Sequence, residues 1–173
     1  MMPPKNEIIK RLMATEGATY IWGGNWAQGI PELLNFYPPQ DKIDSDLTTQ
    51  WQLKGVDCSG LLYEATNGIT PRNTSGLVNY GQAVEIENIT LDAMIQNIEP
   101  LDVIVWRGHV MVALDQERVI QSRLAYPDMP GEKGVKIQSL RFVLAELLKE
   151  KKAVNDYASF PDQQRFVIRR WVK

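Results

Sequence analysis

Two side chains that can do covalent chemistry together occur once each in this sequence. Cys58 is the single cysteine and His109 the single histidine. A thiolate is a strong nucleophile, and an imidazole is a common base for removing the thiol proton. One cysteine excludes an intramolecular disulfide, and one cysteine with one histidine cannot complete a four-ligand structural zinc site. We therefore expect thiol chemistry that uses no metal and no cofactor.

Cys58 stands at the start of a predicted helix. Asp57 is a good N-cap residue, and the apolar residues that follow repeat at helical spacing, which predicts a helix over residues 58–68. A helix N-terminus lowers the pKa of a thiol, and Gly60 lets backbone or substrate come close. The same residues also fit a small, inert cysteine at the start of a core helix.

His109 follows a short turn and opens an apolar strand. A hairpin that turns at residues 115–117 would bring His109 and Gln121 to the same end of two neighbouring strands. The amide oxygen of Gln121 could then hold the ring and fix its tautomer. On spacing alone, a half-exposed histidine without a task fits equally well, and a solvent-facing glutamine fits better than an orienting one.

The order of the predicted elements indicates an α+β fold. Helices come first and an antiparallel series of strands follows, so the pattern does not alternate as in α/β proteins. The length of 173 residues fits one domain, residues 1–173. The predicted helices are 6–16, 58–68, 91–97 and an inserted helix at 142–152; the predicted strands are 102–106, 109–114, 118–123, 134–139 and 165–172.

Residues 25–56 form a long irregular connection rich in proline and aromatic residues. Connections of this length are usually functional or disordered. The aromatic residues Trp26, Phe36, Tyr37 and Trp51 favour an ordered loop that packs on the body, next to Cys58. They either narrow a site there or anchor the loop to the core.

Charge and hydropathy exclude several partners. The net charge is −2, so no basic field is available to hold nucleic acid. No apolar run approaches the roughly 20 residues that span a bilayer, so we expect no integral membrane segment. The opening MMPPKNEIIK lacks the apolar stretch of a signal peptide. We expect a cytoplasmic protein, or one of the cell envelope or secreted if an export signal has been removed.

Several segments together resemble the NlpC family of bacterial cell-wall cysteine peptidases, a compact branch of the papain-like fold. The matching segments are TYIWGG, DCSGLL, TPRNTS with YGQAV, LDVIVWRGHVMVAL, VIQS and GVKIQSL. They follow the family's order and cover nearly the whole chain outside residues 25–56 and the helix at 142–152. The resemblance implies a central helix that begins at the nucleophile and packs on an antiparallel sheet.

The resemblance also implies a role for each matching residue. Cys58 matches the nucleophile, His109 the general base, and Gln121 the residue that orients the ring. Tyr20 matches a tyrosine whose hydroxyl points at the nucleophile, as an oxyanion donor or positioning group. A further set matches residues that bind substrate or line the cleft: Asp57, Ser59, Trp22, Arg72 and Gly108.

The implied reaction is hydrolysis of an amide bond in peptidoglycan stem peptides through a thioester. The bond would lie next to D-glutamate, often between γ-D-Glu and diaminopimelate. Two alternatives stay open: a thiol amidase, acyltransferase or effector that acts on a non-wall protein or a lipid amide, and a wall-binding module without activity.

The chain departs from the family pattern in two places that bear on the site. Leu101 replaces the glycine that often precedes the first long strand, which leaves the turn there in question. Gln121 is neutral, so it can fix a histidine tautomer but cannot stabilise imidazolium as a carboxylate does.

Overall fold

A seven-stranded sheet with helices on both faces forms the body of the protein. The computed structural model describes residues 1–158 and 163–172. The strand order is β3-β9-β4-β5-β6-β7, with β8 paired to β9 in parallel and all other neighbours antiparallel. The strands are β3 (Gln82–Ala83), β4 (Val103–Trp106), β5 (His109–Ala113), β6 (Arg118–Arg123), β7 (Gly134–Ser139), β8 (Lys152–Ala153) and β9 (Arg165–Arg170).

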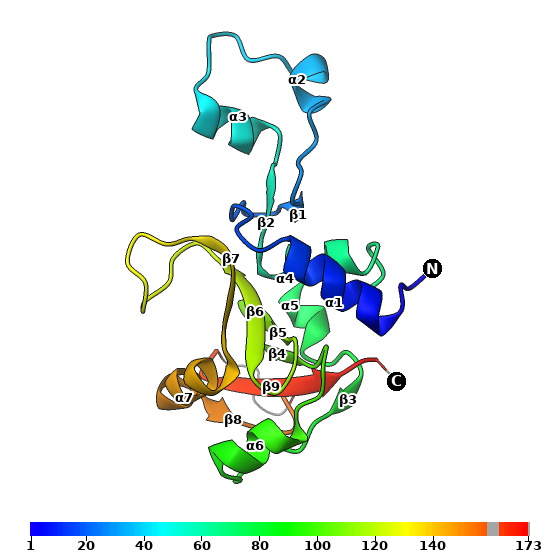
Figure 1. Cartoon of the computed structure of the whole chain (residues 1–173), viewed down its shortest axis with the longest axis vertical. Coiled ribbons are helices and arrows are strands. Elements are labelled where there is room, and N and C mark those ends of the chain that lie inside the picture. The colour runs from blue at the N-terminus through cyan, green and yellow to red at the C-terminus, as the bar shows by residue number, and fades with distance from the viewer. Residues whose placement is uncertain (159–162, 173) are drawn as a thin grey trace.

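The two helical layers lie above and below this sheet in Figure 1. On one face, α1 (Lys5–Ala14) packs against α4 (Cys58–Ala65), which contacts β5 and β6, while α5 (Thr74–Leu77) contacts β4. On the other face, α6 (Leu91–Asn97) packs against α7 (Leu140–Glu150), which contacts β6 and β7. The alternation of side chains in β6 matches this division, because Ser122 bonds to Val56 beside α4 while Gln121 faces α7.

The predicted helices and long strands are confirmed, with shifts at their ends. The helix predicted over 58–68 ends at Ala65, because Asn67 and Gly68 take positive φ values of 56° and 74°. The helix predicted over 142–152 begins earlier, at Leu140, because the Ser139 hydroxyl accepts a hydrogen bond from the backbone N–H of Phe142.

Residues 25–56 contain more regular structure than the sequence predicted. They form β1 (Asn25–Trp26), α2 (Leu33–Phe36), α3 (Ser45–Trp51) and β2 (Gly55–Val56). The ladder pairs Asn25 with Val56 and Trp26 with Gly55, so both ends of the segment are held together. We call the part between these strands, residues 27–54, the arm.

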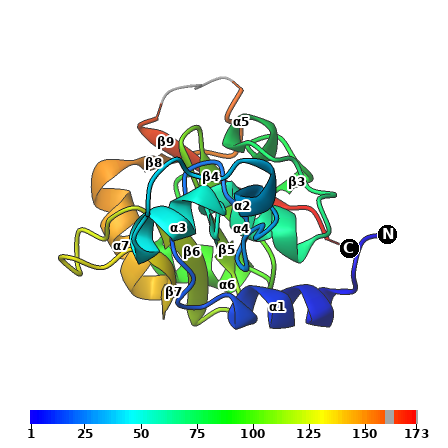
Figure 2. The same cartoon turned by 90° about the horizontal axis from the view of Figure 1, so that it is seen from above.

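The arm projects away from the body. Viewed from above, α2 and α3 stand over α4 and the sheet, while the side view shows them well separated from it (Figures 1 and 2). The exposed fractions of Trp26, Phe36, Tyr37 and Trp51 are 51%, 74%, 68% and 40%. Both expectations for these aromatic residues are therefore wrong: they neither anchor the segment to the core nor line the pocket around Cys58.

Leu101 forms the turn before β4 without a glycine. Its φ is +74°, so the chain keeps a left-handed conformation there with a residue other than glycine. The backbone N–H of Leu101 donates to Ala113, its carbonyl accepts from the Trp171 indole, and its side chain is buried. Packing and hydrogen bonds on three sides thus hold a strained turn that starts β4.

The first turn of α4 lies directly on the backbone of the Gly23–Gly24 turn. The backbone N–H of Asp57 donates to the Gly24 carbonyl. A Cβ added at Gly60 would lie 2.0 Å from that carbonyl oxygen, which is far closer than contacting atoms allow. Gly60 is therefore required by close approach of two backbone segments, as the sequence suggested.

We expect Gly60→Ala to lower the free energy of unfolding by about 1–3 kcal/mol, because the added methyl group must push α4 away from Gly24. Gly76→Ala in α5 is the matched control, since its new Cβ would meet only the Pro71 side chain, at 3.0 Å. Urea denaturation measures both. Equal effects at the two glycines would contradict the close-approach argument.

Candidate active site

Asp57 is the hub of the site. Its Oδ1 accepts hydrogen bonds from the backbone N–H of Gly60 at 2.7 Å and from the Ser59 hydroxyl at 3.3 Å. Its Oδ2 accepts from the backbone N–H of Gly23 at 3.0 Å. Arg72 donates to both oxygens, at 3.0 Å and 2.6 Å, and also to the Ser59 hydroxyl at 2.7 Å. One carboxylate thereby caps α4 and joins it to two loops.

The thiol of Cys58 projects from the first residue of α4. Hydrogen bonds from the backbone N–H groups of Val110 and Ser59 reach it, so it lies against the backbone of β5 at Val110. Burial raises the pKa of the Cys58 thiol, and the Asp57 charge raises it further; the hydrogen bonds oppose both. The expected lowering by the helix N-terminus is therefore outweighed, because burial and the capping carboxylate both disfavour the thiolate.

A pocket of about 390 Å³ opens beside Cys58. It brings together all of the residues expected to bind substrate or position the reaction on this side: Tyr20, Trp22, Asp57, Ser59, Arg72 and Gly108. The sequence analysis missed Thr74, which also lines it and whose hydroxyl accepts from the backbone N–H of Gly108 at 3.1 Å. Trp22 is 86% exposed, so its indole forms an open apolar wall.

Tyr20 adds a protonated hydroxyl to this pocket. Burial raises the pKa of Tyr20, and electrostatic interactions with Cys58, where it is ionised, and with the Asp57 carboxylate raise it further, while Arg72 opposes them. The phenol therefore stays protonated at neutral pH and keeps its ability to donate a hydrogen bond.

His109 on β5 and Gln121 on β6 lie side by side. The Nε2 atom of His109 is 2.8 Å from the Oε1 atom of Gln121. Gln121 is 1% exposed, so its alternative as a solvent-facing strand residue is excluded. An amide oxygen only accepts, so Nε2 carries the proton and Nδ1 is left as the basic nitrogen.

The environment of His109 favours its neutral form. Burial lowers the pKa of His109 to about 4; the Gln121 hydrogen bond raises it, and the charges of Arg123 and Lys151 lower it. The Trp106 ring lies against the imidazole, with the ring centroids 5.3 Å apart. Cys58 and His109 are therefore both uncharged at neutral pH, as a thiol and an imidazole.

Comparison with protein-family models found no match, and comparison with curated proteins found none either. The fold is shared with solved structures. RipB, described as a peptidoglycan hydrolase of Mycobacterium tuberculosis, is 18% identical with a TM-score of 0.53; the match covers 98% of this chain and 65% of RipB. A P60 domain of an antigen from M. avium subspecies paratuberculosis is 19% identical with a TM-score of 0.50, covering 79% of this chain and 85% of that domain.

These similarities confirm the predicted α+β, papain-like fold, and the resemblance to the NlpC family holds at the level of the fold. The match spans 65% of the RipB chain, which is less than two thirds of its length. No helix among residues 1–158 and 163–172 has the length and apolar character needed to cross a membrane.

We expect the Asp57–Arg72 pair to contribute strongly to stability. Arg72→Met should lower the free energy of unfolding by about 2–3 kcal/mol, because it leaves a buried carboxylate with fewer donors. Asp57→Asn keeps a helix cap, so the double variant should lose less than the sum of the two single variants. Arg118→Met, which breaks an exposed pair with Asp115, is the control and should cost under about 1 kcal/mol. Additive effects at Asp57 and Arg72 in urea denaturation would contradict the coupling.

Because His109 is buried in its neutral form, we expect the free energy of unfolding to decrease as the pH is lowered. Its pKa is about 4 in the folded chain and 6.5 when unfolded, so the unfolded chain binds more protons between these values. The stability that comes from burying neutral His109 is fully present above pH 6.5. It decreases by about 3 kcal/mol as the pH falls to 4. His109→Gln removes this loss, while the carboxylates titrate in both proteins. Parallel curves of unfolding free energy against pH would show that His109 is not buried in its neutral form.

Proposed function

We propose that this chain is a cysteine peptidase that hydrolyses amide bonds in peptidoglycan stem peptides. Cys58 is the nucleophile, His109 the general base and Gln121 the residue that orients the imidazole. The observation that carries the proposal is the placement of the Cys58 thiol between a pocket of about 390 Å³ and β5, where it accepts a hydrogen bond from the residue after His109.

Because Cys58 and His109 are both neutral at rest, proton transfer and nucleophilic attack occur together in the first step. Since the pKa of Cys58 is raised and that of His109 is lowered, we propose that the proton moves from Sγ to Nδ1 while Sγ attacks the carbonyl carbon. The resulting oxyanion is held by backbone N–H groups at the start of α4 and by the protonated Tyr20 hydroxyl. This arrangement stabilises charge only as it forms.

The remaining steps return the site to its starting state. The C–N bond breaks, the imidazolium proton passes to the leaving amine, and a thioester to Cys58 remains. Water then attacks the thioester while Nδ1 of His109 takes up its proton. Collapse of this second intermediate releases the carboxylic acid and regenerates the thiol and the neutral imidazole.

The pocket supports a small peptide as substrate. Asp57, Ser59 and Arg72 bond mainly to one another, so they form a rigid polar floor, and the exposed Trp22 adds an apolar wall. We propose that short free stem peptides or partly processed wall bind here, with the D-glutamate residue on the acyl side. Cleavage between γ-D-Glu and diaminopimelate follows from the resemblance to the NlpC family.

The decisive experiment is mass spectrometry of defined stem tripeptides and tetrapeptides incubated with the purified protein. We expect product masses that identify the cleaved bond, and none with Cys58→Ala or His109→Ala. Gln121→Ala should lower kcat by about 10- to 100-fold, because it removes only the orientation of the ring.

The variants separate the proposal from its alternatives. Product from Cys58→Ala would contradict a thiol nucleophile. No product from the parent protein would overturn small-peptide hydrolysis and favour a non-wall amide substrate or a binding module. Circular dichroism of each variant establishes that a loss of product is not a loss of fold.

A further inference from the structure

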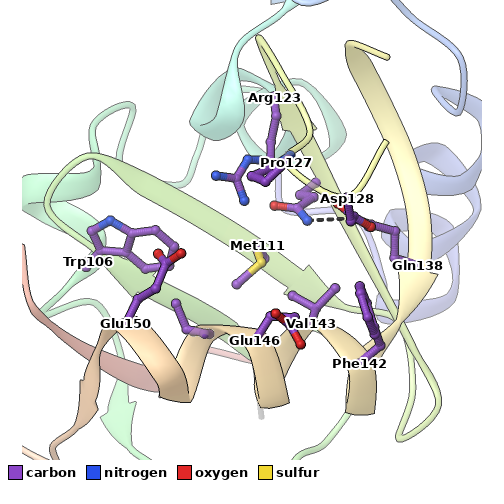
Figure 3. Close-up of a pocket in the computed structure, with 12 residues that line it drawn as sticks. Trp106, Met111, Arg123, Pro127, Asp128, Gln138, Phe142, Val143, Glu146 and Glu150 are labelled. Atoms are coloured by element: carbon purple, nitrogen blue, oxygen red, sulfur yellow. Dashed lines mark hydrogen bonds between the residues drawn. The ribbon is translucent and has the colours of Figure 1, made fainter. Parts of the chain in front are cut away.

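A chain of polar side chains continues behind Gln121, on the face of the sheet covered by α7. The Nε2 atom of Gln121 donates to Oε1 of Gln138 at 2.7 Å. The Nε2 atom of Gln138 donates to Oδ2 of Asp128 at 3.1 Å. Figure 3 shows Gln138 and Asp128 side by side at the edge of the pocket between α7 and the sheet. None of these bonds belongs to the pocket around Cys58.

The sheet places the members of this chain. Gln121 pairs with Lys136 across β6 and β7, so Gln138, two residues further along β7, lies on the same face as a diagonal neighbour. Asp128 comes from the connection between β6 and β7. Met111 and Val143 add apolar walls to the pocket that these groups line.

The hydrogen bonds in this series run in one direction because Asp128, at its end, can only accept hydrogen bonds. An amide can turn over and exchange its oxygen for its NH₂ group, but a carboxylate has no donor. Asp128 therefore turns the NH₂ group of Gln138 toward itself, and the oxygen of Gln138 then faces Gln121. Gln121 must in turn offer its NH₂ group to Gln138 and its oxygen to His109.

We propose that Asp128 and Gln138 are positioning residues that fix the tautomer of His109. A reversed Gln121 amide would donate to Nε2 and move the ring proton to Nδ1, which would remove the base. The Asp128 carboxylate prevents this reversal through two glutamines. The role in catalysis rests on the proposed function, whereas the control of the tautomer does not.

The single histidine allows a direct test. In protein labelled with nitrogen-15 histidine, the two ring nitrogens of His109 report the tautomer without interference from any other imidazole. At neutral pH we expect the parent to show a protonated Nε2 and an unprotonated Nδ1. Asp128→Asn and Gln138→Met should each show a mixture of tautomers. A parent with the proton on Nδ1, or variants with the parent's spectrum, would overturn the proposal.

Turnover of a stem peptide adds a second readout. In Asp128→Asn and Gln138→Met, kcat should fall by about two- to tenfold, in proportion to the loss of the Nε2–H tautomer. KM should stay unchanged because neither residue lines the pocket around Cys58. A fall in kcat with an unchanged tautomer would contradict the proposal. If the parent cleaves no stem peptide, the proposed function fails while the spectra still decide the tautomer.

A double variant distinguishes direction from mere packing. Gln138→Glu with Asp128→Asn moves the carboxylate one link closer to Gln121, and the new asparagine can donate to it. The double variant should regain the parent's tautomer and most of its kcat, whereas a structural defect would be made worse. Glu146→Gln is the control, since Glu146 lines the same pocket but pairs with Lys149; it should change neither readout.

Discussion

The Asp57 carboxylate is the constraint on which the arrangement around Cys58 depends. It accepts hydrogen bonds from the Gly23 turn, from the first turn of α4 and from Arg72, so three segments that are distant in the sequence meet at one group. A charge buried in this way is stable only while all of its donors stay in place. The interactions of the Asp57 carboxylate therefore fix the position of the adjacent Cys58 thiol. The charge of the same carboxylate raises the pKa of that thiol.

The site holds Cys58 in a defined position and at the same time keeps the free thiol weakly reactive. Cys58 and His109 are held in their neutral forms by burial, and charge appears only when a carbonyl group is attacked. A thiol in this state is protected from adventitious oxidation and alkylation, because those reactions need the thiolate. As a consequence, the thiol is activated only when a bound substrate places its carbonyl group next to Sγ.

Local signals made much of this structure predictable. The cap at Asp57 and the apolar spacing after it predicted α4, and the expected hairpin of β5 and β6 brought His109 to Gln121. The sequence did not reveal Gln138 and Asp128, because their contacts depend on the register of a further strand pair and on the loop between β6 and β7. Short strands such as β3 and β8 were also missed, since both pair with β9, far away in the chain. The roles of the site residues stay predictions.

Closing the arm with a two-residue ladder has a consequence for how this protein can change over evolutionary time. The ends of residues 25–56 are fixed against each other, and the entropy of closing a loop grows only slowly with its length. Residues can thus be gained or lost between β1 and β2 with little effect on α4 or Cys58. The arm is a place where homologous chains are free to diverge in length and in the surface they display, while the chemistry beneath it stays the same.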